Sequence, residues 1–342
     1  MKTWVILIWL SVLLSCVGLQ QEDVKKLEVK ELVTHTNLIL KELQKQKFYM
    51  LKGKPNESNK IVLEDVSING KSAQLILDTG ASSSFISQKY LKRFHLKKYD
   101  YHEDMKPIFI TAFGDPEVDT FPTVAEEVNI GGLILNSWPF SVHEISLKHG
   151  LLGVDFLCYA NAVIFCRFGL IGFSMSHQPA QNLNVMLKEY GYTEVEFLVP
   201  KKSENKGVRI KWMENGKLVD LSSSVFFVPF CFEGREGIAL VDTGAPFTVI
   251  DWDLAKEMDL RIDFDYNILA DLQGNIGTLS ATKIKNWSIG NYHIGKAYVG
   301  VVKPPKKNNH GPYRTVGVIG LDTLIEHHAI IDFGNKRLYF QR

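Results

Sequence analysis

Two seven-residue stretches decide the fold: Leu75-Ile76-Leu77-Asp78-Thr79-Gly80-Ala81 and Ala239-Leu240-Val241-Asp242-Thr243-Gly244-Ala245. Each places Asp-Thr-Gly-Ala directly after three apolar residues, and the two Asp residues stand 164 positions apart (242 minus 78). A turn signal precedes each stretch, Asn69-Gly70-Lys71 in the first and Glu233-Gly234-Arg235 in the second. Self-similarity at a fixed offset predicts that one structural unit occurs twice in the chain.

The ends of the two halves repeat as well. Leu151-Leu152-Gly153-Val154-Asp155 matches Val318-Ile319-Gly320-Leu321-Asp322 at an offset of 167 (320 minus 153). At that offset Ala162-Val163-Ile164 matches Ala329-Ile330-Ile331. Because the landmarks recur in the same order with little drift, we expect two copies of one fold.

Short apolar runs with β-type alternation dominate from Ile61 onward. Ile61–Ile68 alternates, Asn69-Gly70 is a hairpin signal, and Ala73–Leu77 reads as a strand that leads into Asp78. A further hairpin is expected at Asn215-Gly216. The pattern predicts an all-β protein with few short helices.

Composition shifts suggest where the domains lie. Residues 19–59 contain a stretch, 21–47, that is rich in Glu, Lys, Gln and Leu with loose helical periodicity, typical of a helical spacer. A propeptide over the active site is the alternative for this stretch. The expected order is an export signal at 1–18, the spacer at 19–59, a first domain at 60–174, a polar linker at 175–206 and a second domain at 207–342.

The N-terminus has the features of an export signal. Lys2 precedes an apolar run, Trp4–Leu14, which suits a signal-peptide core better than a membrane span. Small residues at Cys16 and Gly18 fit ordinary cleavage, whereas Leu13-Leu14-Ser15-Cys16 resembles a lipobox with a lipid anchor on Cys16. Either reading predicts an extracytoplasmic protein: periplasmic, a cell-envelope lipoprotein or secreted.

Charge and cysteine usage exclude several function classes. The 342 residues carry 39 Lys plus Arg against 38 Asp plus Glu, so no nucleic-acid partner is expected. His and Cys show no metal-ligand spacing, and we expect neither a metal nor a cofactor. Cys158, Cys166 and Cys231 are expected to be buried free thiols, with a Cys158–Cys166 disulfide as the alternative.

Asp78 and Asp242 are the candidate catalytic residues. Hydrolysis of an amide without a metal needs one group that deprotonates water and another that protonates the carbonyl oxygen. Two adjacent carboxyl groups do not both ionise easily, so such a pair holds one proton over a broad pH range and supplies both groups. One Asp from each copy would form the pair.

The residues after each Asp are expected to support the active-site loops: Thr79, Gly80 and Ala81 in the first copy, and Thr243, Gly244 and Ala245 in the second. The glycines would permit a sharp backbone turn, and the threonine hydroxyls would bond across the interface. The alanines offer no hydroxyl to the ionised carboxylates, which predicts a mildly acidic optimum.

These paired motifs resemble the retropepsin-like aspartic proteases, and in particular bacterial members with two such domains in one chain. The resemblance covers roughly residues 60–174 and 207–342. It implies two β-barrel domains related by a pseudo-twofold axis, with Leu151-Leu152-Gly153 and Val318-Ile319-Gly320 behind the active-site loops. It also implies a flap over the substrate, with candidates Phe113 and Gly114 in one half and Gln273 and Gly274 in the other.

Other residues have plainer interpretations. Asp155 and Asp322 follow the apolar-Gly signature and are expected to cap helices. Ser82 is replaced by Pro246 in the second copy, which predicts a cleft with unequal sides.

The function expected from the sequence is an exported aspartic endopeptidase that hydrolyses a peptide or protein substrate and works as a monomer. An exported peptide-binding module of the same fold, without turnover, is the alternative. A passive envelope scaffold held through Cys16 would leave the repeated acidic loops unexplained.

Overall fold

The computed structural model describes residues 21–55, 60–99, 120–144, 149–198, 209–214, 217–222, 225–270, 276–302, 309–310 and 313–341. Two compact units divide the chain, Met1–Gln46 and Lys47–Arg342. The first contains helix α2 (Gln21–Lys45), as the periodicity predicts. Near its end the Lys45 ammonium pairs with the Glu42 carboxylate at 2.9 Å, one helical turn apart.

The first half of the second unit is built on one sheet of order β2-β3-β4-β8-β5-β7-β6. β3 also pairs with β6, which curls the sheet into a barrel-like form. Asn69 and Gly70 both have positive φ, as a tight two-residue hairpin turn requires. The strands are β2 (Lys54–Pro55), β3 (Ile61–Ile68), β4 (Lys71–Leu77), β5 (Phe85–Ser87), β6 (Phe121–Ile130), β7 (Leu133–His143) and β8 (Gly150–Leu152).

The second half repeats this arrangement in the order β17-β18-β21-β16-β23-β15-β14-β19-β20, with β22 paired to β23. β15 and β16 match β4 and β5 at the same offset that separates the two Asp-Thr-Gly motifs. The strands are β14 (Phe227–Phe232), β15 (Arg235–Val241), β16 (Val249–Asp251), β17 (Ile262–Ala270), β18 (Ile276–Ile284), β19 (Trp287–Ile289), β20 (Tyr292–His293), β21 (Ala297–Val302), β22 (Asn309–His310) and β23 (Tyr313–Ile319).

A further sheet, which we call the shared sheet, takes strands from both halves in the order β1-β10-β9-β24-β25-β11. Its strands are β1 (Phe48–Lys52), β9 (Val163–Phe165), β10 (Leu170–Ser174), β11 (Thr193–Glu196), β24 (Ile330–Asp332) and β25 (Arg337–Phe340). At its centre Ile164 pairs with Ile331, its own counterpart in the repeat. This pairing is consistent with the predicted pseudo-twofold relation.

The shared sheet shows at which residue the first strand of each half begins. β1 pairs with β10 from residue 48 onward, upstream of residue 60, where the sequence places the first domain. The segment 175–206, expected to be a linker, contains helix α4 (Leu183–Glu189) and strand β11, which pairs with β25. A short edge strand, β1 or β11, is therefore the first strand that each half contributes to the shared sheet.

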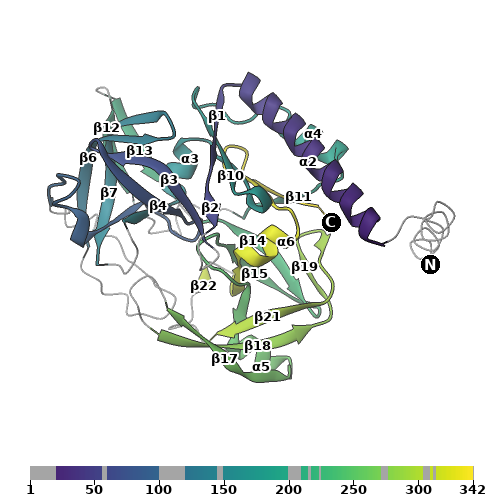
Figure 1. Cartoon of the computed structure of the whole chain (residues 1–342). Coiled ribbons are helices and arrows are strands. Elements are labelled where there is room, and N and C mark those ends of the chain that lie inside the picture. Colours follow the sequence, from purple (N-terminus) through teal and green to yellow (C-terminus); the bar gives the residue numbers. More distant parts are fainter. Residues whose placement is uncertain are drawn as a thin grey trace. The chain divides into compact units, whose positions relative to one another are not determined.

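The hairpin predicted around Asn215-Gly216 forms between β12 (Arg209–Glu214) and β13 (Lys217–Ser222). The two turn residues themselves lie outside the described residues. β12 contacts β7, and β13 contacts α3 (Val154–Tyr159), both of which belong to the first half. In Figure 1 the hairpin accordingly appears beside β6 and β7.

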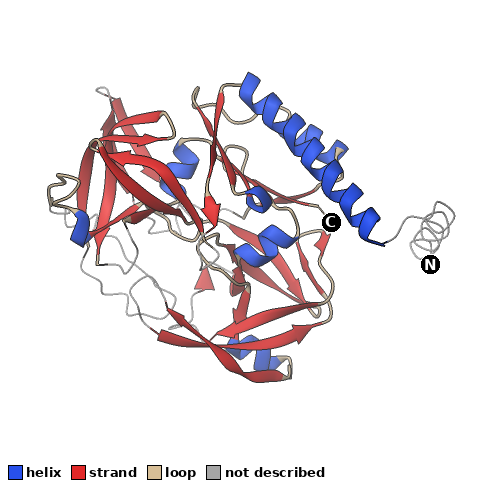
Figure 2. Ribbon diagram, viewed as in Figure 1, coloured by secondary structure: helices blue, strands red, loops and turns tan. Residues whose placement is uncertain are grey.

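Strands dominate the second unit, and its helices are short (Figure 2). Besides α3 and α4 the described residues form α5 (Trp252–Glu257), α6 (Leu321–Glu326) and the 3-10 turns Gln88–Tyr90 and Cys166–Phe168. The expected all-β class with few short helices is confirmed.

The cysteine expectation is partly revised. Cys158, Cys166 and Cys231 are free thiols, so the alternative Cys158–Cys166 disulfide is wrong. Cys166 is fully buried, whereas Cys158 and Cys231 are half-buried. Burial raises the pKa of the Cys158 and Cys166 thiols to about 12. These thiols stay protonated at neutral pH and behave as small apolar side chains.

Candidate active site

Asp78 and Asp242 leave equivalent strands and are held by equivalent backbone bonds. Asp78 follows β4 and its N–H donates to Leu152 O at 3.0 Å; Asp242 follows β15 and its N–H donates to Ile319 O at 3.0 Å. β8 is parallel to β4 and antiparallel to β5, and β23 is related in the same way to β15 and β16. The apolar-Gly segments, Leu151-Leu152-Gly153 and Val318-Ile319-Gly320, therefore lie behind the two motif loops, as the resemblance implies. We call these loops, 78–81 and 242–245, the acidic loops.

The two threonines join the acidic loops by reciprocal hydrogen bonds. The Thr79 hydroxyl donates to Val241 O at 2.8 Å and accepts from Thr243 N–H at 2.9 Å. The Thr243 hydroxyl donates to Leu77 O at 2.9 Å and accepts from Thr79 N–H at 3.2 Å. All four bonds are buried and cross between the halves. The threonine hydroxyls therefore bond across the interface between the halves, as we expect from the sequence.

The two motif glycines lie directly against the carboxyl group of the opposite half. A Cβ on Gly244 would stand 2.5 Å from Asp78 Cγ, and a Cβ on Gly80 would overlap Asp242 Cγ in the same way. Neither glycine has a positive φ. The chain does turn at both glycines, as expected, but the turn does not use the left-handed conformations that favour glycine. Any side chain at either position would fill the space that the partner carboxyl occupies.

Each carboxylate accepts two backbone N–H bonds from its own loop. Asp78 Oδ1 accepts from Gly80 at 2.9 Å and from Ala81 at 3.0 Å. In the second loop Asp242 Oδ1 accepts from Gly244 at 2.7 Å and from Ala245 at 3.2 Å. These donors fix the orientation of each carboxyl group and favour its ionised form. The side chains of the two alanines contribute no further donor.

The electrostatics of the pair oppose a second ionisation. Asp78 is 6% exposed and Asp242 is half-buried. Burial is the largest cause that raises the pKa of each carboxyl. The charge of Asp242 and a hydrogen bond between the two carboxyl groups add to the rise in the pKa of Asp78. Such a pair keeps one shared proton in a pH range where isolated Asp side chains are ionised.

Asp155 and Asp322 are not the N-cap residues of their helices, although Oδ1 of each accepts a first-turn N–H at 2.7 Å, from Phe156 and from Thr323. Helices α3 and α6 begin after Gly153 and Gly320, neither of which provides a side-chain cap, and each Asp lies inside the first turn. Asp155 also accepts from Ser84 N–H at 2.8 Å and from Ser84 Oγ at 2.7 Å. The two carboxylates thus tie helices α3 and α6 to the segments that follow the acidic loops.

Sequence reasoning missed the partners of these acids, Ser84 and Thr248. Thr248 donates to Asp322 Oδ1 through its N–H at 2.8 Å and its hydroxyl at 2.9 Å. Each hydroxyl also accepts a glycine N–H, Gly153 to Ser84 at 3.1 Å and Gly320 to Thr248 at 3.0 Å. The signal was present, because Ser84 and Thr248 stand at the same offset as the two motif Asp residues and are both small hydroxyl residues.

The two sides of the site differ just beyond the motifs. Ser83 is fully buried, whereas its counterpart Phe247, next to Pro246, is 38% exposed. The flap candidates Phe113, Gly114, Gln273 and Gly274 lie outside the described residues. They stay predictions.

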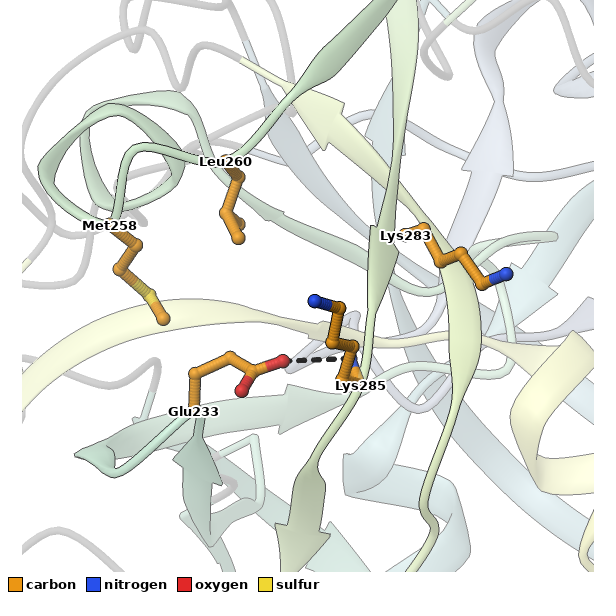
Figure 3. A pocket seen from close by; sticks show the side chains of 5 residues that line it. All are labelled: Glu233, Met258, Leu260, Lys283 and Lys285. Carbon is orange, nitrogen blue, oxygen red and sulfur yellow. Dashed lines mark hydrogen bonds between the residues drawn. The ribbon is translucent and has the colours of Figure 1, made fainter.

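A pocket in the second half lies apart from the acidic loops. It is lined by Glu233, Met258, Leu260, Lys283 and Lys285 (Figure 3). Met258 stands at the repeat position of Phe94, whose ring is fully buried in the first half. Glu233 Oε1 accepts from the N–H groups of Lys285 at 2.7 Å and Asn286 at 3.1 Å. We therefore interpret the pocket as a packing difference between the copies.

Comparisons with known proteins follow the same division into halves. A family model described as gag-polyprotein putative aspartyl protease matches residues 64–159, and one described as aspartyl protease matches residues 228–323. Each matched segment contains one Asp-Thr-Gly motif, so both halves are aspartyl protease domains. The chain belongs to the retropepsin-like aspartic proteases, with two such domains in tandem. The family places the protein among the hydrolases, as a protease.

Solved structures also resemble this chain at low identity. The aspartic proteinase from Irpex lacteus is 13% identical with a TM-score of 0.47, over 86% of this chain and 97% of that one. Conglutin gamma, a unique basic 7S globulin from lupine seeds, is 10% identical with a TM-score of 0.44, over 86% and 94% of the two chains. No curated protein sequence matches the chain.

Proposed function

We propose that this protein is an exported aspartic endopeptidase that hydrolyses peptide bonds with a water activated between Asp78 and Asp242. The observation that carries the proposal is that each carboxyl group packs against the motif glycine of the other half, close enough for Asp242 to raise the pKa of Asp78. The ionised carboxyl would accept a proton from the attacking water while the protonated one donates to the carbonyl oxygen. Protonation is a property of the pair, so neither residue is assigned the proton.

The remaining residues of the loops would keep the pair in this geometry during turnover. The threonine bonds hold the two loops together, and the backbone donors aim each carboxyl group. We propose that an extended peptide binds between the halves through backbone hydrogen bonds, as strand addition permits. The flap candidates would cover it.

Export is proposed from the N-terminal sequence. The apolar run Trp4–Leu14 and the small residues that follow it support removal of a signal peptide or lipidation at Cys16. In the part of the chain that the structure describes, no helix combines the length and apolar character needed to cross a membrane. We propose an extracytoplasmic monomer, since one chain supplies both carboxyl groups.

Cleavage of a mixed peptide library at pH 4–7 tests the proposed reaction. Asp78→Asn and Asp242→Asn should each lower kcat/KM by about 1,000-fold or more, because the pair loses its base or its shared proton. Asp65→Asn, at an exposed position of β3, is the matched control and should keep full activity.

Two outcomes would contradict the proposal. Cleavage that survives both active-site substitutions would assign the chemistry to other residues. Peptide binding without any cleavage by the unaltered protein would favour the alternative, a peptide-binding module of the same fold. Cell fractionation with mass analysis of the mature N-terminus tests export and separates signal cleavage from a lipid on Cys16.

A further inference from the structure

A lysine stands at the start of β3, at the end of the β3–β4 strand pair from which Asp78 follows. β3 and β4 are antiparallel, with Val62 opposite Ile76 and Leu63 opposite Leu75. Continued by two residues, this register places Lys60, immediately before β3, opposite Asp78, immediately after β4. Residues directly opposite in an antiparallel pair direct their side chains to the same face. Lys60 thus shares a face with the first carboxyl group.

The charge of Lys60 acts on both members of the pair. It lowers the pKa of Asp78 and of Asp242, against the larger rise that burial causes. Both carboxyl groups lie in a buried interface, where a nearby charge is less screened than at an exposed surface.

The second half has no such cation at the equivalent position. β14 and β15 pair with Phe227 opposite Leu240, and the same continuation places Val225 opposite Asp242. The alanines at 81 and 245 provide no hydroxyl to either carboxylate. Lys60 therefore makes the electrostatic surroundings of the pair unequal.

Further charged residues stand on the described strands of this half. On β2 and β3, Lys54 forms an ion pair with Glu64, and Asp65 is exposed. Lys71, at the far end of β4, is exposed. On β6, Glu126 and Glu127 are exposed.

We propose that Lys60 is a positioning residue for the reaction: a fixed cation that stabilises the ionised member of the carboxyl pair, in the place of the hydroxyl that Ala81 and Ala245 lack. The inference rests on the proposed peptidase function. It explains how a pair that burial drives toward the neutral form keeps a singly charged state at mildly acidic pH.

The test is the pH profile of kcat/KM from pH 3 to 8 for the full chain and three variants. Lys60→Gln removes the cation. Because the pKa of each carboxyl group then rises, both limbs of the profile should shift to higher pH by about 0.5 to 1 pH unit. Lys60→Arg keeps the charge and should restore the original limbs. Lys71→Gln removes a lysine at the remote end of the same strand pair and should leave them unchanged. Circular dichroism of each variant checks the fold.

Each contrary result has one meaning. If Asp78→Asn and Asp242→Asn abolish cleavage while Lys60→Gln leaves both limbs in place, the peptidase proposal stands and the role of Lys60 is wrong. A change in KM for acidic peptides with unmoved limbs would likewise overturn it, because it would make Lys60 a substrate contact.

A readout independent of turnover separates the two proposals. Carboxyl-carbon NMR titration of Asp78 and Asp242 should show both transitions at higher pH in Lys60→Gln, whether or not the protein cleaves peptides. Unmoved transitions would overturn the inference about Lys60 even in an active enzyme.

Discussion

The glycine of each Asp-Thr-Gly motif packs against a carboxyl group supplied by the other half of the chain. The threonine beside it donates one buried hydrogen bond and accepts another across the same interface. Sequence reasoning selected these residues from their repetition, yet it explained the glycines by backbone freedom. Only the tertiary structure shows that the missing Cβ matters, because the neighbouring carboxyl belongs to the other copy of the repeat.

Gly80→Ala is expected to reduce activity far more than stability. Its Cβ would overlap the Asp242 carboxyl and displace it, and a misplacement of about 1 Å can cost 100-fold in rate. Gly70→Ala is the control: nothing lies within 4 Å of its Cβ, but its φ of 70° makes alanine strained by about 1 kcal/mol. Steady-state kinetics with urea unfolding should show lost turnover for the first variant and lost stability for the second. Equal activity in both would contradict the steric argument.

Thr79→Val tests the bonds that join the acidic loops. Valine keeps the shape of threonine, but it leaves Thr243 N–H without its acceptor and Val241 O without its donor in a buried interface. Each unpaired group should cost about 1–3 kcal/mol of unfolding free energy. Thr79→Ser keeps the hydroxyl and should retain most of the stability. Thermal unfolding of the two variants measures the difference in stability. A Thr79→Val protein as stable as Thr79→Ser would show that the bonds contribute little.

At the scale of elements, the acids of α3 and α6 anchor the helices to the segments after the acidic loops. Asp155 and Asp322 each bind a hydroxyl residue that also holds a glycine N–H. A cap was a reasonable expectation from an acidic residue at a helix start. The actual partner could not be read from local sequence, because Ser84 approaches Asp155 from the segment just before β5, far earlier in the chain.

Asp155 is expected to make the protein less stable as pH rises from about 4 to 6. Burial raises its pKa from 3.8 to about 6, so the folded state holds the proton more tightly than the unfolded chain. That advantage is complete below the unfolded pKa and is lost as pH rises through the folded pKa, a change of about 3 kcal/mol. Urea unfolding at pH 4 and pH 7 should show this loss in the unaltered protein and in exposed Asp65→Asn. If Asp155→Asn lost as much unfolding free energy between pH 4 and pH 7 as the unaltered protein, the assignment of this loss to Asp155 would be wrong.

Strand prediction succeeded where pattern and pairing agree. β3 occupies the predicted Ile61–Ile68, because its alternation buries one face. β11, Thr193–Glu196, carries two glutamates in its short span and has no strand signature. It becomes a strand because β25 offers an unpaired edge, with Val195 opposite Leu338. Its structure therefore depends on a partner that lies at the opposite end of the second half.

At the scale of the whole second unit, the shared sheet couples the two halves. Its central pairing, Ile164 with Ile331, brings together one strand from each copy. The acidic loops are joined on their own account by the threonine bonds. Neither half contains a complete carboxyl pair.

Residues 1–176 and 177–342, produced separately, are expected to be inactive alone and active when combined. The break lies between exposed residues after β10, so it cuts no strand of the shared sheet. Each fragment alone lacks one carboxyl and should fall about 1,000-fold or more in kcat/KM. Co-refolding should restore cleavage, with the intact chain as the reference. Activity from one fragment by itself would show that two identical halves can form the site.

The sequence by itself determined the duplication, the all-β class and the two acidic motifs, because each of these is a local pattern that occurs twice. Tertiary structure decided the rest: why the motif residue must be glycine, what Asp155 and Asp322 bind, and how β11 becomes a strand. The physical reason is the same in each case. A contact between segments that are distant along the chain depends on how the chain closes in space, and local composition carries no record of it.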